Sequence, residues 1–413
     1  MSSGDSLGDS TMQFGRETRD KYYLLHKEKT LVNHGSFGAV PRPVYEQRNT
    51  YIELMEYEPD AWFRWTVDDT MLKNRDRVAQ FISCDPEDVV FVENVTEAIN
   101  DVMWSLPLTK DDGVLVTSVG YHAINITATE VCKVRGATCH KVPLLFPLDS
   151  PGEILTPEAM VKLYADCIND HPDIKLVIVD HITSSSALLM PVKEIIKFCH
   201  SKGIEVLVDA AHAPGQIKID MQDLDPDYYA GNMHKWCHTP RGCALLYIAK
   251  RNQNKMNPIR YSKFQYRNLW YRFTSQGTRD HTPYCCAIAG IDFLNMCGGL
   301  DKVTAYNTSL RDKAQELIAT TWGTPILPVT KELTAPFMCL IMMPDKYHDC
   351  PQTDDVLDKI AHKIYKEYNV LTAVVSHQGR MFCRIGCNIY NTIEDYERLA
   401  KVVLEWDPRK HGL

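Results

Sequence analysis

The sequence has no apolar run of about 18 residues, the length that would suggest a membrane-spanning helix. It also has no cluster of lysine and arginine, and its 45 basic residues against 53 acidic ones give a formal net charge of −8. These absences argue against a membrane partner and against a nucleic-acid-binding surface. We therefore expect the partner of this chain to be a small molecule.

Cysteine is plentiful, with 14 residues, but no C-x-x-C pair is present. The adjacent Cys285 and Cys286 would strain any bridge between them. Scattered cysteines of this kind indicate reduced thiols, so we expect a cytoplasmic protein. The first 20 residues are polar, and Asp5 and Asp9 argue against a mitochondrial presequence. We predict that residues 1–20 form a disordered leader.

The chain is long enough for one large core and a second, smaller one, since it has 413 residues of which 45% are hydrophobic. We predict an N-terminal arm over residues 21–60 that contributes to the small domain and the active site. A large domain follows over 61–298, and a small C-terminal domain over 299–413. The arm contains a helical pattern that begins at Pro43. No internal repeat is present.

Short apolar strands alternate with amphipathic helices in the large domain. We predict strands at 89–92, 114–117, 175–179, 205–208 and 243–247, with helices beginning near 68, 96, 121 and 191. Strands that are apolar almost throughout are typical of a mostly parallel sheet with helices on both faces, so the predicted class is α/β. Strands at 337–341, 371–375 and 382–385, with helices over 354–368 and from 393, predict a compact α+β unit at the C-terminus.

Two residues 26 positions apart carry the most specific chemistry. Asp209 ends the apolar strand of Val206-Leu-Val-Asp-Ala-Ala-His212, and Lys235 lies in a polar-aromatic turn, Gly231-Asn-Met-His-Lys-Trp236. A lysine amine can condense with the aldehyde of pyridoxal phosphate, while a carboxylate keeps the pyridine nitrogen protonated. Taken singly, Asp209 could instead cap the following turn, and Lys235 could be an ordinary exposed lysine. Together they predict a site for pyridoxal phosphate.

Ligands of parallel sheets gather where strands end and helices begin, and Glu93-Asn-Val-Thr-Glu-Ala98 lies at such a junction. Thr96 and the backbone amides of Glu97 and Ala98 could bind a phosphate at the positive end of the helix. The alternative is that Thr96 simply caps the helix.

Three further positions suit the same cofactor. His122, after Tyr121 at the end of a strand, could stack on a planar ring, although such a histidine is more often a hydrogen-bonded surface residue. His234, beside the lysine, and Thr278, in a glycine-containing turn, could complete the binding of a phosphate.

Arg384 lies on an otherwise apolar strand, and a buried arginine needs an anion. A substrate carboxylate and a structural ion pair are equally good explanations for it.

Two clusters combine aromatic residues with arginine, at residues 62–65 and 264–273. They could form a distal substrate pocket, for which the candidates are Tyr57, Arg64, Trp270 and Arg272. They could also form a subunit interface, where tyrosine, tryptophan and arginine are enriched, and we favour the interface.

Six ordered motifs between about Leu31 and Asp395 resemble the class V group of fold-type I pyridoxal-phosphate enzymes. They are Leu31-Val-Asn-His-Gly-Ser-Phe-Gly38, Asp180-His-Ile-Thr-Ser-Ser-Ser-Ala-Leu-Leu-Met-Pro191, Asp209-Ala-Ala-His212, His234-Lys-Trp236, Gly277-Thr278, and Arg384 to Thr392. The first and fourth motifs are most similar to the branch of isopenicillin N epimerase-like proteins, cysteine desulfhydrases and hercynylcysteine sulfoxide lyases.

The resemblance implies a large domain that binds pyridoxal 5'-phosphate, with no metal, and a homodimer. It assigns Lys235 to the covalent bond with the cofactor, Asp209 to the ring nitrogen and His122 to the ring face. Its remaining assignments are Thr96, His234 and Thr278 to the phosphate, with Thr278 reaching the other subunit's site, and Asn33 and Arg384 to the substrate carboxylate. Arg64 is a substrate-binding candidate from the aromatic cluster and not from the resemblance.

Two departures from the desulfurase pattern limit this transfer. Desulfurases tend to have asparagine near the position of Ser184 and glutamine near that of His212, so contacts of these two residues with the ring hydroxyl stay open. Desulfurases also need a cysteine that forms a persulfide ahead of the arginine, and Val370 to Met381 contains none. Transfer of sulfur through an enzyme persulfide is therefore not expected.

The expected chemistry starts with removal of the Cα proton of an amino-acid substrate by Lys235. We favour elimination of a thiol or sulfenate from a cysteine-derived substrate, which yields pyruvate and ammonia. Epimerisation, with Tyr121 or His122 as a second acid-base group, and transamination stay open as alternatives. Intact Lys235, Asp209 and Arg384 argue against a catalytically inactive scaffold.

Overall fold

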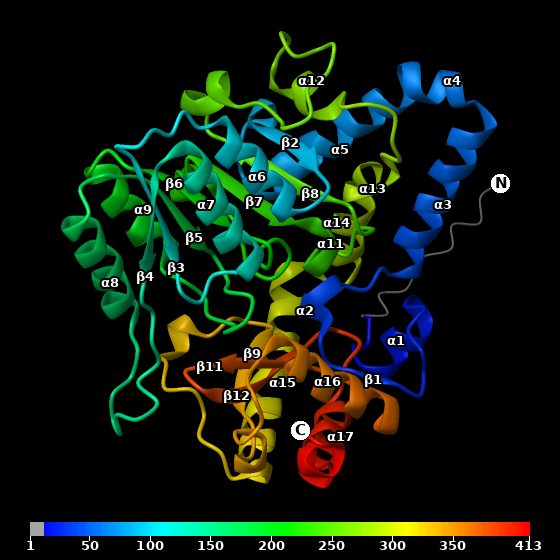
Figure 1. Ribbon diagram of the computed structural model, residues 1–413. Coiled ribbons are helices and arrows are strands. Elements are labelled where there is room, and N and C mark those ends of the chain that lie inside the picture. The colour runs from blue at the N-terminus through cyan, green and yellow to red at the C-terminus, as the bar shows by residue number, and fades with distance from the viewer. Residues whose placement is uncertain (1–11) are drawn as a thin grey trace, which may run out of the picture.

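The computed structural model describes residues 12–413 and consists of a large upper part and a smaller lower part (Figure 1). Residues 1–11 of the predicted leader lie outside the described residues. The leader prediction is wrong from Arg16 onward, because helix α1 (Arg16–Tyr22) begins there. Arg19 of this helix is buried and donates hydrogen bonds to the carbonyl oxygens of His26 and Lys29. These bonds give the segment a tertiary anchor that its polar composition does not reveal.

A seven-stranded sheet forms the centre of the large part (Figure 1). Its strands, in spatial order, are β2 (Val89–Val92), β8 (Ala244–Ile248), β7 (Tyr228–Asn232), β6 (Glu205–Asp209), β5 (Ile174–Asp180), β3 (Gly113–Thr117) and β4 (Thr138–Val142). Strand β8 is antiparallel to both of its neighbours, and the other pairs are parallel. The mostly parallel sheet is as predicted, and its nearly uniform burial explains the apolar strand sequences.

Helices cover both faces of this sheet (Figure 1). The helices of the large part are α5 (Val67–Phe81), α6 (Val95–Ser105), α7 (His122–Arg135), α8 (Pro157–Asp170), α9 (Val192–Ser201), α10 (Met221–Leu224), α11 (Met233–Trp236), α12 (Leu269–Thr274), α13 (Thr282–Cys285) and α14 (Ala287–Met296). Between and beyond them lie a π-helical turn, η1 (Trp62–Thr66), and 3-10 turns at η2 (Pro86–Asp88), η3 (Lys250–Lys255), η4 (Lys331–Leu333), η5 (Asp345–Tyr347) and η6 (Pro408–His411).

Strands β4 and β7 and helix α8 were not predicted from the sequence. β4 is a partly exposed edge strand with polar residues, and β7 contains Gly231 and Asn232, which rarely occur in strands. The predicted turn around Lys235 is wrong. Strand β7 ends at Asn232, and Lys235 follows on the short helix α11.

The small part has its own apolar core, separate from that of the large part. It is built from α15 (Gly299–Trp322), β9 (Met338–Met342), α16 (Asp354–Tyr368), β10 (Val370–Leu371), β11 (Ala373–His377), β12 (Arg380–Gly386) and α17 (Ile393–Glu405). Strand β12 lies between β11 and β9 in an antiparallel sheet. The strands and helices predicted for this unit are present, and α15 was not predicted.

The N-terminal arm joins the two parts. Strand β1 (Thr30–Leu31) pairs with β10 of the small part. Helix α2 (His34–Phe37) then contacts α11, and α3 (Arg42–Tyr57) and α4 (Pro59–Ala61) lead to the large part (Figure 1). Within residues 12–413, no helix combines the length and the apolar character needed to cross a membrane.

Gly38 ends α2 against the backbone of the lysine helix. Its φ is +69°, and a Cβ atom at this position would lie 2.0 Å from the carbonyl oxygen of His234. Only glycine allows this approach, because any side chain would push α2 away from α11.

We expect Gly38→Ala to lower the thermal unfolding midpoint more than Gly412→Ala does. Gly412 has a similar φ, +71°, but nothing lies within 4 Å of its Cβ position. The loss of unfolding free energy in the control therefore comes from the left-handed backbone alone and should be about 1–2 kcal/mol. Any additional loss in Gly38→Ala comes from the clash with α11. Differential scanning calorimetry of both variants checks this, and equal losses would contradict the close packing of α2 on α11.

Candidate active site

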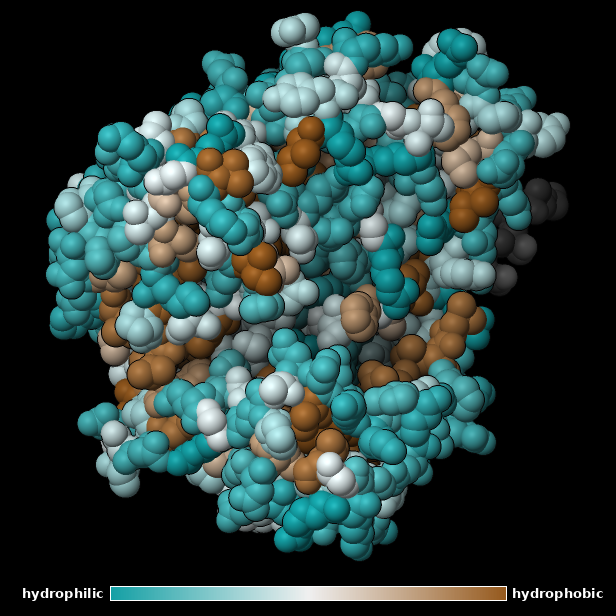
Figure 2. Space-filling model, in the orientation of Figure 1, coloured by the Kyte–Doolittle hydropathy of each residue, from teal (hydrophilic) through white to brown (hydrophobic). Residues whose placement is uncertain are grey.

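A cavity of about 450 Å³ lies at the carboxyl ends of strands β5, β6 and β7. In the same view as Figure 1, the space-filling surface is hollowed between the large and small parts (Figure 2). The cavity is lined by Ser36, Phe37, Asn94, Val95, Thr96, Tyr121, Asp180, Ile182, Ser184, Asp209, Ala211, His212, Asn232, His234, Lys235 and Arg384. Seven of the predicted site residues therefore meet in one place, at the edge of the sheet that the parallel topology predicts.

Lys235 reaches this cavity from α11. Its Nζ atom lies 3.1 Å from Nε2 of His212. Burial and, to a smaller extent, the charge of Arg384 lower the pKa of Lys235, and Asp209 opposes them, so that the pKa is about 7. A large fraction of the amine is thus unprotonated near neutral pH, which is the form that attacks an aldehyde or removes a proton.

Asp209 and Asp180 end neighbouring strands and are register partners. Both are buried, and burial raises the pKa of each carboxyl, that of Asp180 also through the charge of Asp209. Oδ1 of Asp209 accepts a hydrogen bond from the amide of Ala211 at 2.9 Å, so the capping role considered for Asp209 is present. That bond engages one carboxylate oxygen, and Asp209 still lines the cavity.

Arg384 enters from β12 of the small part. It donates hydrogen bonds to the carbonyl oxygen of Ser184 and to Oδ1 of Asn33 and Oγ of Ser36, each at 2.7 Å. Within residues 12–413 no carboxylate forms an ion pair with it, so the explanation by a structural ion pair is wrong. Burial lowers the pKa of Arg384 to about 10, which leaves it charged at neutral pH and in need of an anion.

The start of α6 differs from the predicted phosphate site. Asn94 is the cap, since its Oδ1 accepts from the amide of Glu97 at 2.9 Å, and its carbonyl oxygen accepts from Ala98. The predicted use of the Glu97 and Ala98 amides is therefore wrong, as is the alternative of Thr96 as the cap. The Thr96 side chain lines the cavity, and its amide has no partner among the residues that the structure describes.

The three histidines predicted at the site have different positions. His212 is buried, and burial lowers its pKa well below the ordinary value. Burial also lowers the pKa of His234 to about 4, and its Nδ1 lies 3.0 Å from the carbonyl oxygen of Cys243. His122 is exposed and does not line the cavity, whereas Tyr121 does. The predicted stacking role of His122 is therefore corrected, because α7 begins at His122 while the strand-end loop presents Tyr121.

Thr278 and Arg64 do not line the Lys235 cavity. They border a second hollow of about 600 Å³, which also includes Phe63, Trp65 and Arg267. Arg64 is exposed and forms an ion pair with Asp60 at 2.9 Å. Its predicted contact with substrate is thus not made within one chain, and a role for Thr278 across a subunit interface stays a prediction.

The other candidates for a distal substrate pocket lie elsewhere. Arg272 is buried and donates hydrogen bonds to the carbonyl oxygens of Met256 and Gln253, so it holds a loop together. Trp270 is buried and donates to Oδ1 of Asp68 at 3.0 Å. Tyr57 ends α3 and is 82% exposed. The interpretation of Trp270 and Arg272 as substrate-binding residues is wrong, because sequence spacing does not distinguish a packing arginine or tryptophan from a binding one. The role suggested for Tyr57 stays a prediction.

Several cavity residues were not identified from the sequence, among them Ser36, Phe37, Asp180 and Asn232. Ser36 and Phe37 lie in the motif of residues 31–38, and Asp180 ends a strand as Asp209 does. The motif and the strand-end position could therefore have identified these three residues from the sequence. Asn232 was hidden because β7 was not recognised, and its Oδ1 accepts from the Val95 amide at 3.1 Å. It thereby positions the start of α6 beside α11.

A cluster outside this cavity bears on the prediction that no metal is bound. His140 and His171 stack with ring centroids 4.0 Å apart, and Nε2 of His140 lies 2.8 Å from Oδ2 of Asp173. One ligand atom from each lies within 4.8 Å of the others, a group that could hold a metal ion at the β4 edge of the sheet. The Lys235 cavity has none of these residues in its lining.

The geometry agrees with the comparisons with known proteins. Residues 43–399 match the family described as aminotransferase class V. The chain belongs to this family. The chain is 28% identical over 407 residues to an L-cysteine desulfhydrase of Arabidopsis thaliana, and the match covers 91% of this chain and 87% of that protein. It is 26% identical over 394 residues to isopenicillin N epimerase of Streptomyces clavuligerus, covering 91% and 94%.

A solved structure shares the fold of this class V chain. The complex between the cystine C-S lyase C-DES and its reaction product cysteine persulfide aligns with a TM-score of 0.74 and 18% identity, over 92% of this chain and 99% of that one. This confirms the predicted fold class. The family depends on pyridoxal phosphate, so the chain is a pyridoxal-phosphate enzyme, and the predicted cofactor is confirmed.

The residues of the cavity fit this cofactor. Asp209 and Arg384 are a buried acidic and a buried basic side chain whose hydrogen bonds in the described part of the chain go to neutral groups, and a cationic ring nitrogen and an anionic carboxylate would complement them. Lys235 supplies an amine with a lowered pKa. Thr96 and its amide, at the positive end of α6, together with His234, offer a place for the phosphate.

We expect Arg384→Gln to raise the pKa of Lys235 by roughly 1 or more, because a neighbouring positive charge disfavours the protonated amine. Competitive labelling of the cofactor-free protein with acetic anhydride, followed by mass spectrometry, gives the pH midpoint for Lys235. The control is Arg380→Gln, which changes an arginine of the same strand that pairs with Asp149. An unchanged midpoint in Arg384→Gln would contradict the electrostatic coupling of the two side chains.

Proposed function

We propose that this enzyme cleaves the carbon-sulfur bond of a cysteine-derived amino acid by elimination, releasing pyruvate and ammonia. At the coarser level of the family, carbon-sulfur lyase activity is represented by the relatives named cysteine desulfhydrase. The observation that carries the proposal is a buried amine, Lys235, in one cavity with a buried arginine, Arg384, that has no acidic partner in the described chain. This pair suits removal of a proton from the Cα atom of a carboxylate-bearing substrate.

Pyridoxal phosphate, when bound, supplies the electron sink that makes the Cα proton acidic. The side chains of the protein hold the cofactor and the substrate in position and remove the Cα proton. Lys235 removes the proton, since a large fraction of its amine is neutral near pH 7. Asp209 places a carboxyl group at the end of β6, where it would stabilise a protonated ring nitrogen of the cofactor. Arg384, held by Asn33 and Ser36, binds the α-carboxylate of the substrate.

The chemistry of the cysteines supports elimination without an enzyme persulfide. Cys383, the cysteine next to Arg384, is buried, and burial raises the pKa of its thiol to about 12. Such a thiol is a poor nucleophile. Val370 to Met381 contains no cysteine. The sulfur would therefore leave with the departing group and not remain on the protein.

Epimerisation is the second candidate, and one observation favours it. Tyr121 lines the cavity and is 48% exposed, so its hydroxyl is available as a second acid-base group. A relative named isopenicillin N epimerase shares most of the chain's length. Epimerisation returns the proton to Cα, whereas elimination expels the sulfur group, so the product distinguishes the two.

We expect the purified enzyme to form pyruvate from at least one compound in a panel of S-substituted cysteines and cysteine sulfoxides. Lys235→Ala should lower the rate by roughly 100- to 10,000-fold, because the general base is lost. Lys193→Ala, which changes an exposed lysine paired with Asp223, should keep the rate. A lactate dehydrogenase-coupled assay measures pyruvate.

A substrate-induced change in cofactor absorbance without pyruvate would contradict the lyase proposal. In that case uptake of solvent deuterium at Cα without keto acid indicates an epimerase. Turnover that depends on an added keto acid indicates an aminotransferase.

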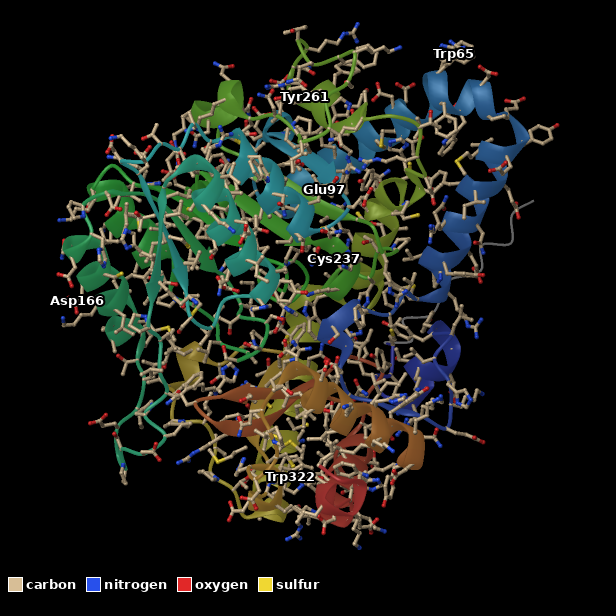
Figure 3. All side chains as sticks on the ribbon, viewed as in Figure 1. Trp65, Glu97, Asp166, Cys237, Tyr261 and Trp322 are labelled. Atoms are coloured by element: carbon tan, nitrogen blue, oxygen red, sulfur yellow. The ribbon has the colours of Figure 1, made fainter. Side chains whose placement is uncertain are left out.

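The homodimer expected from the resemblance is also a proposal. Trp65 is 67% exposed and Tyr261 is 69% exposed, and both lie at the upper end of the molecule (Figure 3). Trp65 borders the hollow that contains Thr278, together with Phe63, Arg64 and Arg267. Exposed aromatic and arginine side chains of this kind are enriched at subunit interfaces. A cytoplasmic location stays a prediction.

We expect Trp65→Asp to shift the protein toward the monomer in sedimentation velocity experiments, because a charge would be buried at the interface. Val134→Asp is the control, since Val134 is 66% exposed on α7 and does not border this hollow. Dimers that persist in Trp65→Asp, or monomers in the wild-type protein, would refute this interface.

A further inference from the structure

His212 makes a hydrogen bond with each of its two ring nitrogens. Nε2 lies 3.1 Å from Nζ of Lys235, and Nδ1 lies 3.4 Å from Nε1 of Trp236. The imidazole is 1% exposed, so these two side chains decide where its proton resides. Neither contact was anticipated from the sequence, in which Trp236 is only the neighbour of the lysine.

The tryptophan contact determines the tautomer of His212. An indole nitrogen carries a hydrogen and can only donate, so Nδ1 of His212 must accept and cannot carry a proton. Burial lowers the pKa of His212 well below its ordinary value, which keeps the ring neutral with a single N–H group. That N–H group is therefore on Nε2, the nitrogen that faces Lys235.

The tautomer in turn determines the state of Lys235. A protonated lysine has three donors and no acceptor, so it cannot receive a hydrogen bond from Nε2–H. An unprotonated nitrogen has a lone pair and can. The 3.1 Å contact is therefore favourable for the neutral amine and unfavourable for the ammonium ion.

We propose that Trp236 is a positioning residue for the reaction: its indole N–H holds the proton of His212 on Nε2, which donates to the nitrogen of Lys235 and keeps that nitrogen unprotonated. The inference rests on the proposed role of Lys235 as the reactive amine, and it holds for elimination and epimerisation alike. It adds to the site a residue that does not line the cavity.

The indole is held firmly enough to play this part. Trp236 is 1% exposed, and its ring lies against that of His34 at 4.7 Å and edge-on to Phe337 at 5.4 Å. Gly35 passes so close that a Cβ atom there would lie 3.2 Å from the indole. His34 also fixes the helix backbone, since its Nε2 lies 2.8 Å from the carbonyl oxygen of Lys235.

The charged neighbours of the two groups act in a different way. Arg384 disfavours and Asp209 favours a proton on Lys235 through their charges. Lys235, Arg384, His234 and His34 disfavour a proton on His212. Trp236 is neutral, so its removal leaves this field unchanged and alters only the hydrogen-bonding direction. This difference makes the proposal testable separately from electrostatics.

The test replaces Trp236 by phenylalanine in the full-length chain and reads two properties other than turnover. In cofactor-free protein labelled with ¹⁵N-histidine, NMR reports which nitrogen of His212 carries the proton, and His212→Gln identifies the signal. We expect Nε2–H in the wild type and a substantial Nδ1–H population in Trp236→Phe. In the same cofactor-free proteins, the acetic anhydride midpoint of Lys235 should rise by about 0.5 to 1 pH unit, the value of one hydrogen bond.

Two controls separate positioning from packing. Trp322→Phe removes an indole that donates to the carbonyl oxygen of Ala400 at 3.0 Å. Figure 3 shows Trp322 in the small part, well below Cys237, the residue that follows Trp236 in the chain. This substitution should therefore move neither readout. A glutamine has no tautomers, so Trp236→Phe in the His212→Gln background should not move the midpoint further. If Trp236→Phe does not fold, His212→Leu, which removes the N–H donor, should raise the midpoint while His212→Gln keeps it.

An Nε2–H tautomer without any detectable Nδ1–H population in Trp236→Phe would overturn the proposal. So would an unchanged midpoint, or an equal shift in the His212→Gln background, since the last indicates packing alone. Neither readout depends on product formation, and failure of the pyruvate assay with these results intact would reject the lyase reaction but not the role of Trp236.

Discussion

The lysine amine at the end of the sheet has to be kept neutral inside the protein, and much of the site serves this requirement. Burial removes the water that would stabilise an ammonium ion, and the guanidinium of Arg384 adds a repelling charge. Arg384 in turn stays charged because it donates to neutral oxygens on Asn33, Ser36 and Ser184. Its charge is thus available both to tune Lys235 and to bind a substrate anion.

This requirement explains why the two parts of the molecule must be packed precisely. Lys235 belongs to the large part and Arg384 to the small part, and each part has its own core. The arm connects them, with β1 paired to β10 and α2 packed on α11. A displacement of either part would therefore change the pKa of Lys235 as well as the shape of the cavity.

Much of the fold was predictable because the strands are buried on both faces. Apolar runs such as Val89–Val92 and residues 176–179 are recognisable as buried strands in the sequence. The first run leads into helix α6, and the second ends at Asp180. Strand β7 was missed because glycine and asparagine occupy it, and its propensity is outweighed by pairing with β6 and β8. The resemblance supplied the branch of the family, which the matched relatives confirm.

The sequence by itself determined the fold class, the cofactor and the central pair of Asp209 and Lys235, since these depend on residue type and position along strands. Only the tertiary structure decided that Arg384 has neutral partners, that Asn94 caps α6, that Tyr121 and not His122 lines the cavity, and that Trp236 donates to His212. Each of these depends on which atom faces which across elements distant in the chain, and hydrogen-bond direction cannot be inferred from spacing along the chain.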